Sequence, residues 1–386
     1  MGKYEQGELL SQIESYSDTE IKPVRPRNIP SPASEKFKQR QVNFSAFGWQ
    51  FQIVAAILLS LIYRKKLMKV KVEGKTEDIE IYLKNEDPIF IQAKSTTQKM
   101  DEFHGEKTPC KGAIETLLNT SNSQANNYSK LIYINNFLNP LKLEDSVKKV
   151  YWEPTANELL IKDYDALPSS GKDFLKDRLK EAQDELDKGN YFSDTNNFDW
   201  KKFEIITLIM DNNDSNNKFN ILHRTIENVL IKVKSQIYSD ELSSSFITQY
   251  LNNATKKEET IFKEDILWRF IYELVEKTAD KYLDDLDLII QEEVESYSNR
   301  FITEQTLNID IINRVYSDFN SDFNLFKEKN NSRELQKFLD EEWEKLKEDF
   351  PIDEDMEIQK GCIQDMIWKI LKKKRIIDRL KEEFNV

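Results

Sequence analysis

Apolar and polar residues alternate along two short segments in the first third of the chain. Every odd position of Asp78–Leu83 is apolar and every even position is polar, which is the period of a strand with one buried face. The odd positions of Ile89–Lys94 are also apolar, and Gln92 and Lys94 share the opposite face. Residues 84–88 between the segments form a polar turn that ends in proline. The pattern predicts a β-hairpin that brings an acid, an amide and an ammonium onto one patch.

The pattern up to residue 212 predicts a mixed α/β domain behind an N-terminal arm. Residues 1–35 mix serine, proline and charged residues, so we expect them to be irregular. Residues 36–212 are expected to form a domain with a mixed central sheet flanked by helices. Its predicted helices cover residues 35–63, 112–119 and 168–188, and its predicted strands cover residues 68–73, 78–83, 88–95, 130–136, 149–152 and 203–210.

Beyond residue 212, strand patterns nearly vanish. The polar segment 211–217 is typical of a linker. Apolar residues then recur at helical spacing, as at Ile266, Phe270 and Leu274. The predicted helices cover residues 219–238, 240–254, 260–283, 284–300, 308–328, 332–349 and 356–384. We therefore expect residues 213–386 to form an all-α C-terminal domain that binds partners or mediates oligomerisation.

Composition narrows the class of protein. Hydrophobic residues make up 39% of the 386 residues, which is enough for packed cores, and glycine is scarce at nine. The longest apolar run, residues 53–62, is much shorter than the roughly 20 residues of a membrane span, and no secretion leader opens the chain. We expect a cytoplasmic protein that does not contact a membrane. Cys110 and Cys362 lie too far apart for a zinc-finger spacing or a disulfide framework.

Charge is distributed unevenly along the chain. The net charge is −13, but residues 1–150 hold 22 Lys+Arg and 18 Asp+Glu, so the acidity lies in the later part. The densest basic cluster contains Arg64, Lys65, Lys66 and Lys69, just before the first predicted strand. Two interpretations of this cluster remain open: a solvated helix end, where cations suit the helix dipole, or a patch that contacts the phosphates of DNA.

The predicted hairpin carries the residue types of phosphodiester hydrolysis. A carboxylate and an amide oxygen are suitable ligands for a hard divalent cation such as Mg²⁺ or Mn²⁺, and a lysine can offset the charge of an attacked phosphate. The alternative is that the acids and lysines of a half-exposed hairpin face solvent and have no catalytic role. No phosphate-binding loop or dinucleotide fingerprint occurs, so ATP hydrolysis by this chain is not expected.

An ordered set of motifs resembles a known family. Phe47–Gln52 opens an apolar helix, Val72-Glu73 and Glu77-Asp78 follow, and the last motif is Gln92-Ala93-Lys94. This order is similar to the PD-(D/E)XK restriction-like nucleases. It resembles more narrowly the endonuclease domain of CD-NTase-associated defence effectors and of Lamassu-type and other three-component defence systems. The resemblance covers roughly residues 44–136 and implies a restriction-endonuclease-like N-terminal domain.

The resemblance also implies roles for the residues that match the motifs. Asp78 would be the main metal-binding carboxylate, and Gln92 would be a second ligand at a position where the superfamily often has glutamate. Glu73 is a candidate second acid. Lys94 would orient or activate the attacking water, and Gln52 on the helix would steady the site.

The resemblance further implies a biological setting. We expect a metal-dependent endonuclease that cuts double-stranded DNA as an anti-phage effector. The helical second domain departs from the nucleotide sensor of CD-NTase-type effectors and is more like the nuclease subunit of a Lamassu-type complex. Its partners would be an SMC-like ATPase and a small accessory subunit, and cutting both strands favours a homo-oligomer. The alternatives are a catalytically silent adaptor that binds DNA or a partner, and a nuclease gated by a cyclic oligonucleotide.

Overall fold

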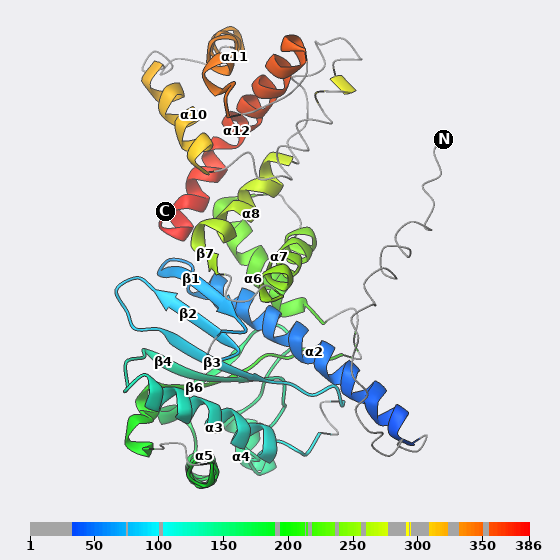
Figure 1. Ribbon diagram of the computed structural model, residues 1–386, viewed down its shortest axis with the longest axis vertical. Coiled ribbons are helices and arrows are strands. Elements are labelled where there is room, and N and C mark those ends of the chain that lie inside the picture. The colour runs from blue at the N-terminus through cyan, green and yellow to red at the C-terminus, as the bar shows by residue number, and fades with distance from the viewer. Residues whose placement is uncertain are drawn as a thin grey trace, which may run out of the picture. The chain divides into compact units, whose positions relative to one another are not determined.

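The computed structural model describes most of the chain from residue 33 onward (Figure 1). The described residues are 33–74, 76–99, 103–189, 194–212, 214, 218–235, 239–255, 260–276, 291–292, 294, 309–322, 332–349 and 355–386. Nearly all of the expected N-terminal arm, and most of the predicted helix over 284–300, lie outside them. The chain divides into two units, Met1–Phe44 and Ser45–Val386. The sheet and every helix after the first lie in the second unit.

A seven-stranded mixed sheet is the centre of the second unit, in the order β5-β6-β4-β3-β2-β1-β7. β3 pairs in parallel with β4, which pairs in parallel with β6, and the other pairs are antiparallel. The strands are β1 (Leu67–Val72), β2 (Ile79–Leu83), β3 (Ile89–Lys94), β4 (Lys130–Asn135), β5 (Leu160–Asp163), β6 (Phe203–Thr207) and β7 (Ile261–Phe262).

Helices flank this sheet and then dominate the chain after β6. The α-helices are α2 (Ala33–Ile62), α3 (Lys107–Ser123), α4 (Asp145–Tyr151), α5 (Ser169–Lys188), α6 (Asn220–Val233), α7 (Ser239–Ala254), α8 (Lys263–Glu276), α10 (Ile309–Asp322), α11 (Ser332–Leu346) and α12 (Met356–Phe384). Short 3-10 turns occur at Tyr164–Ala166, Thr195–Asn197 and Trp200–Lys202. The predicted class, a mixed sheet with flanking helices followed by a largely helical region, is confirmed. No helix among the described residues is long and apolar enough to cross a membrane.

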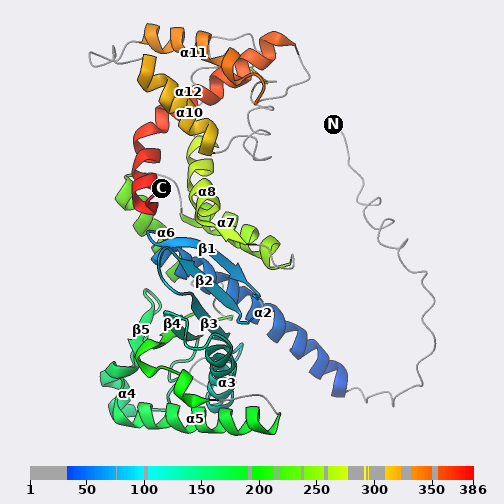
Figure 2. The ribbon, with the colours of Figure 1, turned by 60° about the vertical axis from the view of Figure 1, so that its left-hand side comes forward.

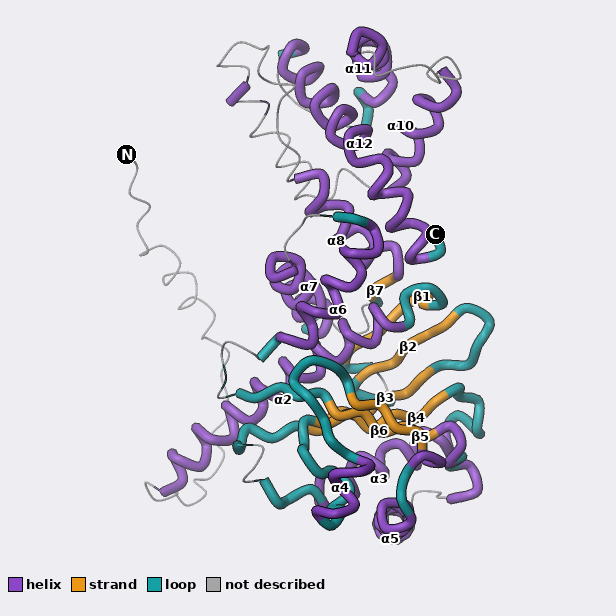
Figure 3. Tube along the Cα trace, turned by 180° about the vertical axis from the view of Figure 1, so that it is seen from behind, coloured by secondary structure: helices purple, strands orange, loops and turns teal. Residues whose placement is uncertain are grey.

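The two faces of the sheet bury different apolar clusters. The part of α2 from residue 45 onward covers one face, and α3 and α5 cover the other (Figures 1 and 3). The cluster on the α2 face contains the odd positions of β2 and β3 and continues without a break into α6–α8 and α10–α12. The cluster on the α3 face contains Phe90, Tyr133 and Trp152. The alternation of apolar positions therefore selects the buried face as expected, because successive side chains of a strand point to opposite sides.

The helical region joins the sheet directly. β7 pairs with β1, so this region supplies the last strand (Figures 1 and 3). α7 and α8 also contact β1 (Figure 2). Arg64 just after α2 forms an ion pair with Glu383 near the end of α12. The division of the chain near residue 212 stays a prediction, and the apolar cluster on the α2 face runs across it.

One expected strand is wrong. Residues 149–152 were expected to be extended, but α4 occupies Asp145–Tyr151 and Trp152 caps its end. Asp145 lies in the first turn and Lys148 and Lys149 lie in the last, an arrangement that the helix dipole favours. The apolar run that suggests a strand is explained instead by burial of Trp152 alone. β5 and β7 have no counterpart among the predicted strands, because each is short and only partly buried.

Candidate active site

The register of the β2–β3 hairpin places Asp78 beside Gln92. Ile79 pairs with Ile91 in an antiparallel ladder, so Asp78, just before β2, lies opposite Gln92 of β3. The Asp78 Oδ2 atom accepts hydrogen bonds from the Gln92 side-chain amide and from the backbone N–H of Ala93, the latter at 2.9 Å. The carboxylate and the amide are therefore in direct contact at the end of the sheet.

Two further predicted residues reach the same carboxylate. The Gln52 side chain on α2 lies close enough to Asp78 to favour its charged form. Lys94, the last residue of β3, lies on the same face as Gln92 and is close enough to stabilise the charge of Asp78 electrostatically. Glu73 follows β1 and interacts electrostatically with both Asp78 and Lys94. The structure thus brings together all five residues that the sequence motifs selected around the hairpin.

The pKa values of the two acids depend on burial, which disfavours their charged forms, and on nearby polar and charged groups. Burial raises the pKa of Asp78, and the Ala93 N–H, the Lys94 ammonium and the amides of Gln52 and Gln92 offset part of that increase. The pKa of Glu73 is also raised, first by burial and then by the neighbouring charge of Asp78, whereas Lys94 lowers it. A carboxylate with a raised pKa and an adjacent ammonium is an arrangement that often accompanies acid–base or metal chemistry.

A sixth residue, Glu77, belongs to the Glu77-Asp78 motif but was not among the predicted site residues. Its side chain is 4% exposed, and its Oε1 atom accepts a hydrogen bond of 2.6 Å from the Thr120 hydroxyl of α3. Its Oε2 atom is buried without a hydrogen-bond partner among the described residues. The pKa of Glu77 is raised to about 8, chiefly by burial; the Thr120 hydrogen bond and the Lys94 charge oppose this increase, and the charge of Asp78 adds to it. The adjacency of two acids was the available signal, but their burial depends on α3.

Glu80 shares a face of β2 with Asp78 but stabilises the β1–β2 turn instead. Its Oε1 atom accepts hydrogen bonds from the backbone N–H and the hydroxyl of Thr76, and its Oε2 atom accepts one from the Tyr82 hydroxyl at 2.7 Å. A Cβ atom at Gly74 would collide with this carboxylate, so another residue there would displace the Glu80 side chain. The saturated hydrogen bonding of Glu80 makes it a structural residue of the hairpin.

Asn136 fixes the segment that follows Lys94. Its Oδ1 atom accepts a hydrogen bond from the Thr96 N–H at 2.8 Å, and its amide donates to the Thr96 carbonyl at 2.9 Å. The same amide donates to the carbonyl of Met210 at 3.0 Å. The ends of three adjacent segments are tied together, which restricts the position of the Lys94 backbone.

The four basic residues proposed as DNA contacts have different surroundings. Arg64 pairs with Glu383 and also donates to the Leu61 carbonyl at 2.9 Å. Lys65 is exposed, and Lys66 pairs with Glu86 at 2.6 Å. Lys69 lies over the Tyr82 ring, with its ammonium 4.7 Å from the ring centroid. Contact with DNA stays a prediction for all four, and Arg64 would have to leave an ion pair to make it.

The donor set fits a lightly held Mg²⁺ rather than a caged metal. Among the described residues, no group of three His, Cys, Asp or Glu side chains is arranged to hold an ion. Mg²⁺ commonly keeps several waters and is bound by only one or two carboxylates together with substrate phosphates. Asp78 and Gln92 meet that requirement if the amide rotates to present its oxygen. The unpaired Oε2 atom of Glu77 is a further oxygen of the right chemistry next to Asp78.

No protein-family model, curated protein or solved structure matches this chain. The geometry of the hairpin and the order of its motifs are therefore the observations that bear on function.

Proposed function

We propose that this chain is a metal-dependent DNA endonuclease. The observation that carries the proposal is the convergence of Asp78, Gln92 and Lys94 from adjacent strands, with Asp78 in contact with Gln92 and electrostatically coupled to Lys94. An acid, an amide oxygen and an ammonium at one sheet end form the chemical set that phosphodiester hydrolysis by a divalent cation uses.

The order of elements supports the same conclusion. Gln52 lies on α2, Glu73 follows β1, Asp78 precedes β2, and Gln92 and Lys94 lie in β3. This succession agrees with the order in which the resembled PD-(D/E)XK nucleases present their motif residues. The contact between Gln52 and Asp78 also links the helix motif to the strand motif, which lie 26 positions apart in the chain.

Each residue then has a distinct role in the reaction. Asp78 and Gln92 would hold Mg²⁺ or Mn²⁺, which when bound supplies a Lewis acid beside the scissile phosphate. Lys94 would orient the attacking water and offset the negative charge that builds on the phosphate. Gln52 would steady the Asp78 carboxylate through its side-chain amide. Glu73 would provide a second acid at the edge of the site.

The helical region suggests how such an enzyme is controlled. An uncontrolled nuclease endangers its own cell, and the large helical region provides a surface for partners. We propose that it belongs to an anti-phage complex of the Lamassu type, with an SMC-like ATPase and a small accessory subunit. Cleavage of both strands of DNA would require a homo-oligomer. Light scattering of the isolated chain and of its mixture with these partners tests the assembly.

A second candidate function is a catalytically silent adaptor that binds DNA or an SMC-like partner. The specific observation in its favour is the neutral amide of Gln92, which leaves fewer than three convergent acidic or imidazole ligands in the described residues. A third candidate, gating by a cyclic oligonucleotide, is tested by adding such compounds to the cleavage assay.

Plasmid cleavage by purified protein in Mg²⁺ or Mn²⁺ tests the main proposal. We expect Asp78→Asn to abolish cutting, whereas Asp87→Asn, an exposed acid in the turn at the other end of β2, keeps it. Absence of cutting by the wild-type chain, even with its partner subunits and in both metals, would favour the adaptor. Equal cutting by wild type and Asp78→Asn would contradict the assigned site.

A further inference from the structure

Trp152 has a polar group without a partner. The residue caps α4, its side chain is 0% exposed, and its backbone N–H donates to the Lys148 carbonyl at 2.7 Å. The indole Nε1–H, however, has no hydrogen-bond acceptor among the described residues. Buried tryptophan N–H groups usually have an acceptor, and an unpaired buried donor costs about 1–3 kcal/mol. An acceptor that enters the space next to the ring would remove this cost.

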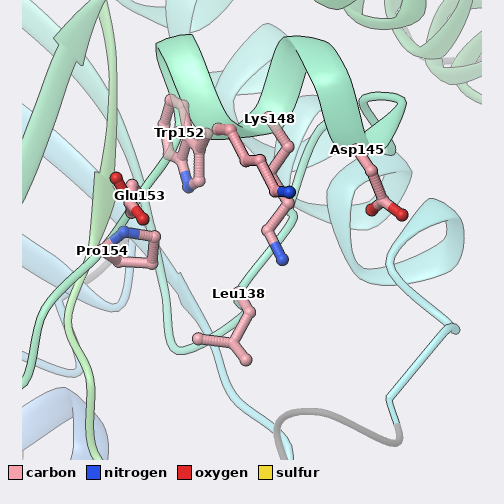
Figure 4. Close-up of a pocket in the computed structure, with 7 residues that line it drawn as sticks. Leu138, Asp145, Lys148, Trp152, Glu153 and Pro154 are labelled. Atoms are coloured by element: carbon pink, nitrogen blue, oxygen red, sulfur yellow. The ribbon is translucent and has the colours of Figure 1, made fainter.

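The indole borders a pocket with an apolar side. Leu138 and Pro154 line it together with Trp152, and Figure 4 shows the indole nitrogen on the side of the ring that faces them. The pocket has a volume of about 240 Å³, whereas one water occupies about 30 Å³ in the liquid. The space is therefore large enough for a chemical group bigger than a single water.

Four charges surround the opening and sum to zero. Lys148 and Lys149 line the pocket and form no ion pair with any described residue, and Asp145 and Glu153 line it as well. In Figure 4 the Asp145 carboxylate points away from the indole, while the Lys148 ammonium extends toward Leu138. An anion held by Lys148 and Lys149 is opposed by the two acids, so a group with one negative charge is tolerated better than a dianion. A phosphodiester carries one negative charge and adjoins apolar sugar atoms.

The pocket lies at the same edge of the sheet as the candidate active site. β3 and β4 are parallel neighbours, and Lys94 at the end of β3 pairs with Asn135 at the end of β4. Leu138 follows that end by three residues, and Asn136 ties it to the segment after Lys94. A polymer with regularly spaced phosphates could therefore pass from Lys94 to the pocket.

We propose that this pocket binds a phosphodiester group of a nucleic-acid strand, at a position that flanks the phosphate attacked at Lys94. Trp152 Nε1–H donates to a non-bridging oxygen, and the ammonium groups of Lys148 and Lys149 flank it. The sugar packs on Leu138 and Pro154. The assignment of this strand as a substrate rests on the proposed nuclease function, whereas binding to the pocket does not require cleavage.

Fluorine NMR of the full-length protein labelled with 5-fluorotryptophan tests the pocket, with Trp152→Phe identifying its resonance. The titrant is a 12-base-pair DNA duplex in EDTA, so that no divalent cation is present and no cutting occurs. We expect the Trp152 resonance to shift on addition of duplex. Lys148→Ala/Lys149→Ala should raise the dissociation constant about tenfold and reduce the slope of log K against log salt by about two.

The matched control is Lys176→Ala/Lys180→Ala, which removes two exposed lysines from α5 and should leave duplex binding nearly unchanged. The inference is overturned if duplex binds while the Trp152 resonance stays fixed, if duplex does not bind, or if inorganic phosphate shifts the resonance equally. A shift of the Trp152 resonance in a protein that never cuts DNA would contradict the nuclease function and support the pocket. Cutting by a protein whose Trp152 resonance does not move would support the nuclease function and contradict the pocket.

Discussion

The sheet region and the helical region each bury a glutamate whose pKa is raised, and the surroundings of the two differ. Burial raises the pKa of Glu77 to about 8 in the sheet region and that of Glu342 to about 7 in the helical region. Glu77 adjoins Asp78 and interacts with Lys94 at the end of the hairpin. Glu342 accepts a hydrogen bond of 2.7 Å from Lys345, one turn away on α11, and interacts electrostatically with Asp318 of α10.

This comparison separates burial from function. A raised pKa reports that a carboxyl group has lost water, which packed helices achieve as readily as an active site does. The glutamate of the sheet region differs because an acid, two amides and a lysine from three elements meet beside it. Among the described residues of the helical region no such convergence surrounds Glu342, for which one acid and one lysine are the named partners. Convergence of several elements, rather than a perturbed pKa, is the stronger indication of chemistry.

The largest effect is expected from removing the Lys94 ammonium, which lies beside the sheet-region glutamate. Lys94→Met should reduce plasmid cleavage by about 100-fold or more, because the charge that offsets the developing phosphate charge is lost. Lys84→Met removes an exposed lysine from the turn at the other end of the hairpin and should keep full cleavage. Glu342→Gln should also keep it. Initial rates of supercoil loss measure all three, and loss of cleavage in Glu342→Gln would contradict the distinction between the regions.

The second-largest effect is expected on stability, when Glu77, the glutamate of the sheet region, is removed. Glu77→Ala leaves the Thr120 hydroxyl without its acceptor and opens a cavity, so the free energy of unfolding should fall by about 2–3 kcal/mol. Glu77→Gln keeps the shape and an acceptor and should lose much less. Urea unfolding followed by circular dichroism measures both. Equal destabilisation by the two variants would show that the charge, rather than the buried hydrogen bond, matters.

The helical-region glutamate should make stability depend on pH. Its folded pKa of about 7 exceeds the ordinary value of 4.5, so the folded state retains a proton that the unfolded state loses. Its contribution is complete below pH 4.5 and is lost as the pH rises to about 7. Wild type should lose about 1 kcal/mol more than Glu342→Gln between pH 5 and pH 7. Identical losses in urea unfolding at the two pH values would rule out this ionisation as a cause.

The smallest effect concerns the connection between the regions. Arg64 and Glu383 are 12% and 20% exposed in their side chains, and a double-mutant cycle to alanine should give a coupling energy of about 1 kcal/mol. The exposed pair Lys66 and Glu86 should give less than about 0.5 kcal/mol in the same measurement. Equal coupling would mean that Arg64 is as free for DNA as the exposed lysine.

Local pattern was sufficient for the hairpin and its candidate residues. Apolar residues at alternate positions of β2 and β3 selected the buried face, and the short turn fixed which residues meet, so Asp78 and Gln92 could be paired from the sequence. The motif order located Gln52 on the preceding helix. The same local reasoning gave a strand at residues 149–152, where the α4 helix forms, because a short apolar run fits either element.

By itself, then, the amino-acid sequence determined the period, the turn and the order of chemical groups along the hairpin, because these depend on residues within a few positions of one another. Only the tertiary structure decided which polar groups lose water. Glu77 is buried by Thr120, 43 positions away, and Arg64 is held by Glu383, 319 positions away. The Trp152 pocket likewise depends on how the segment after β4 meets α4. Burial arises from contacts between distant segments, and no local period records it.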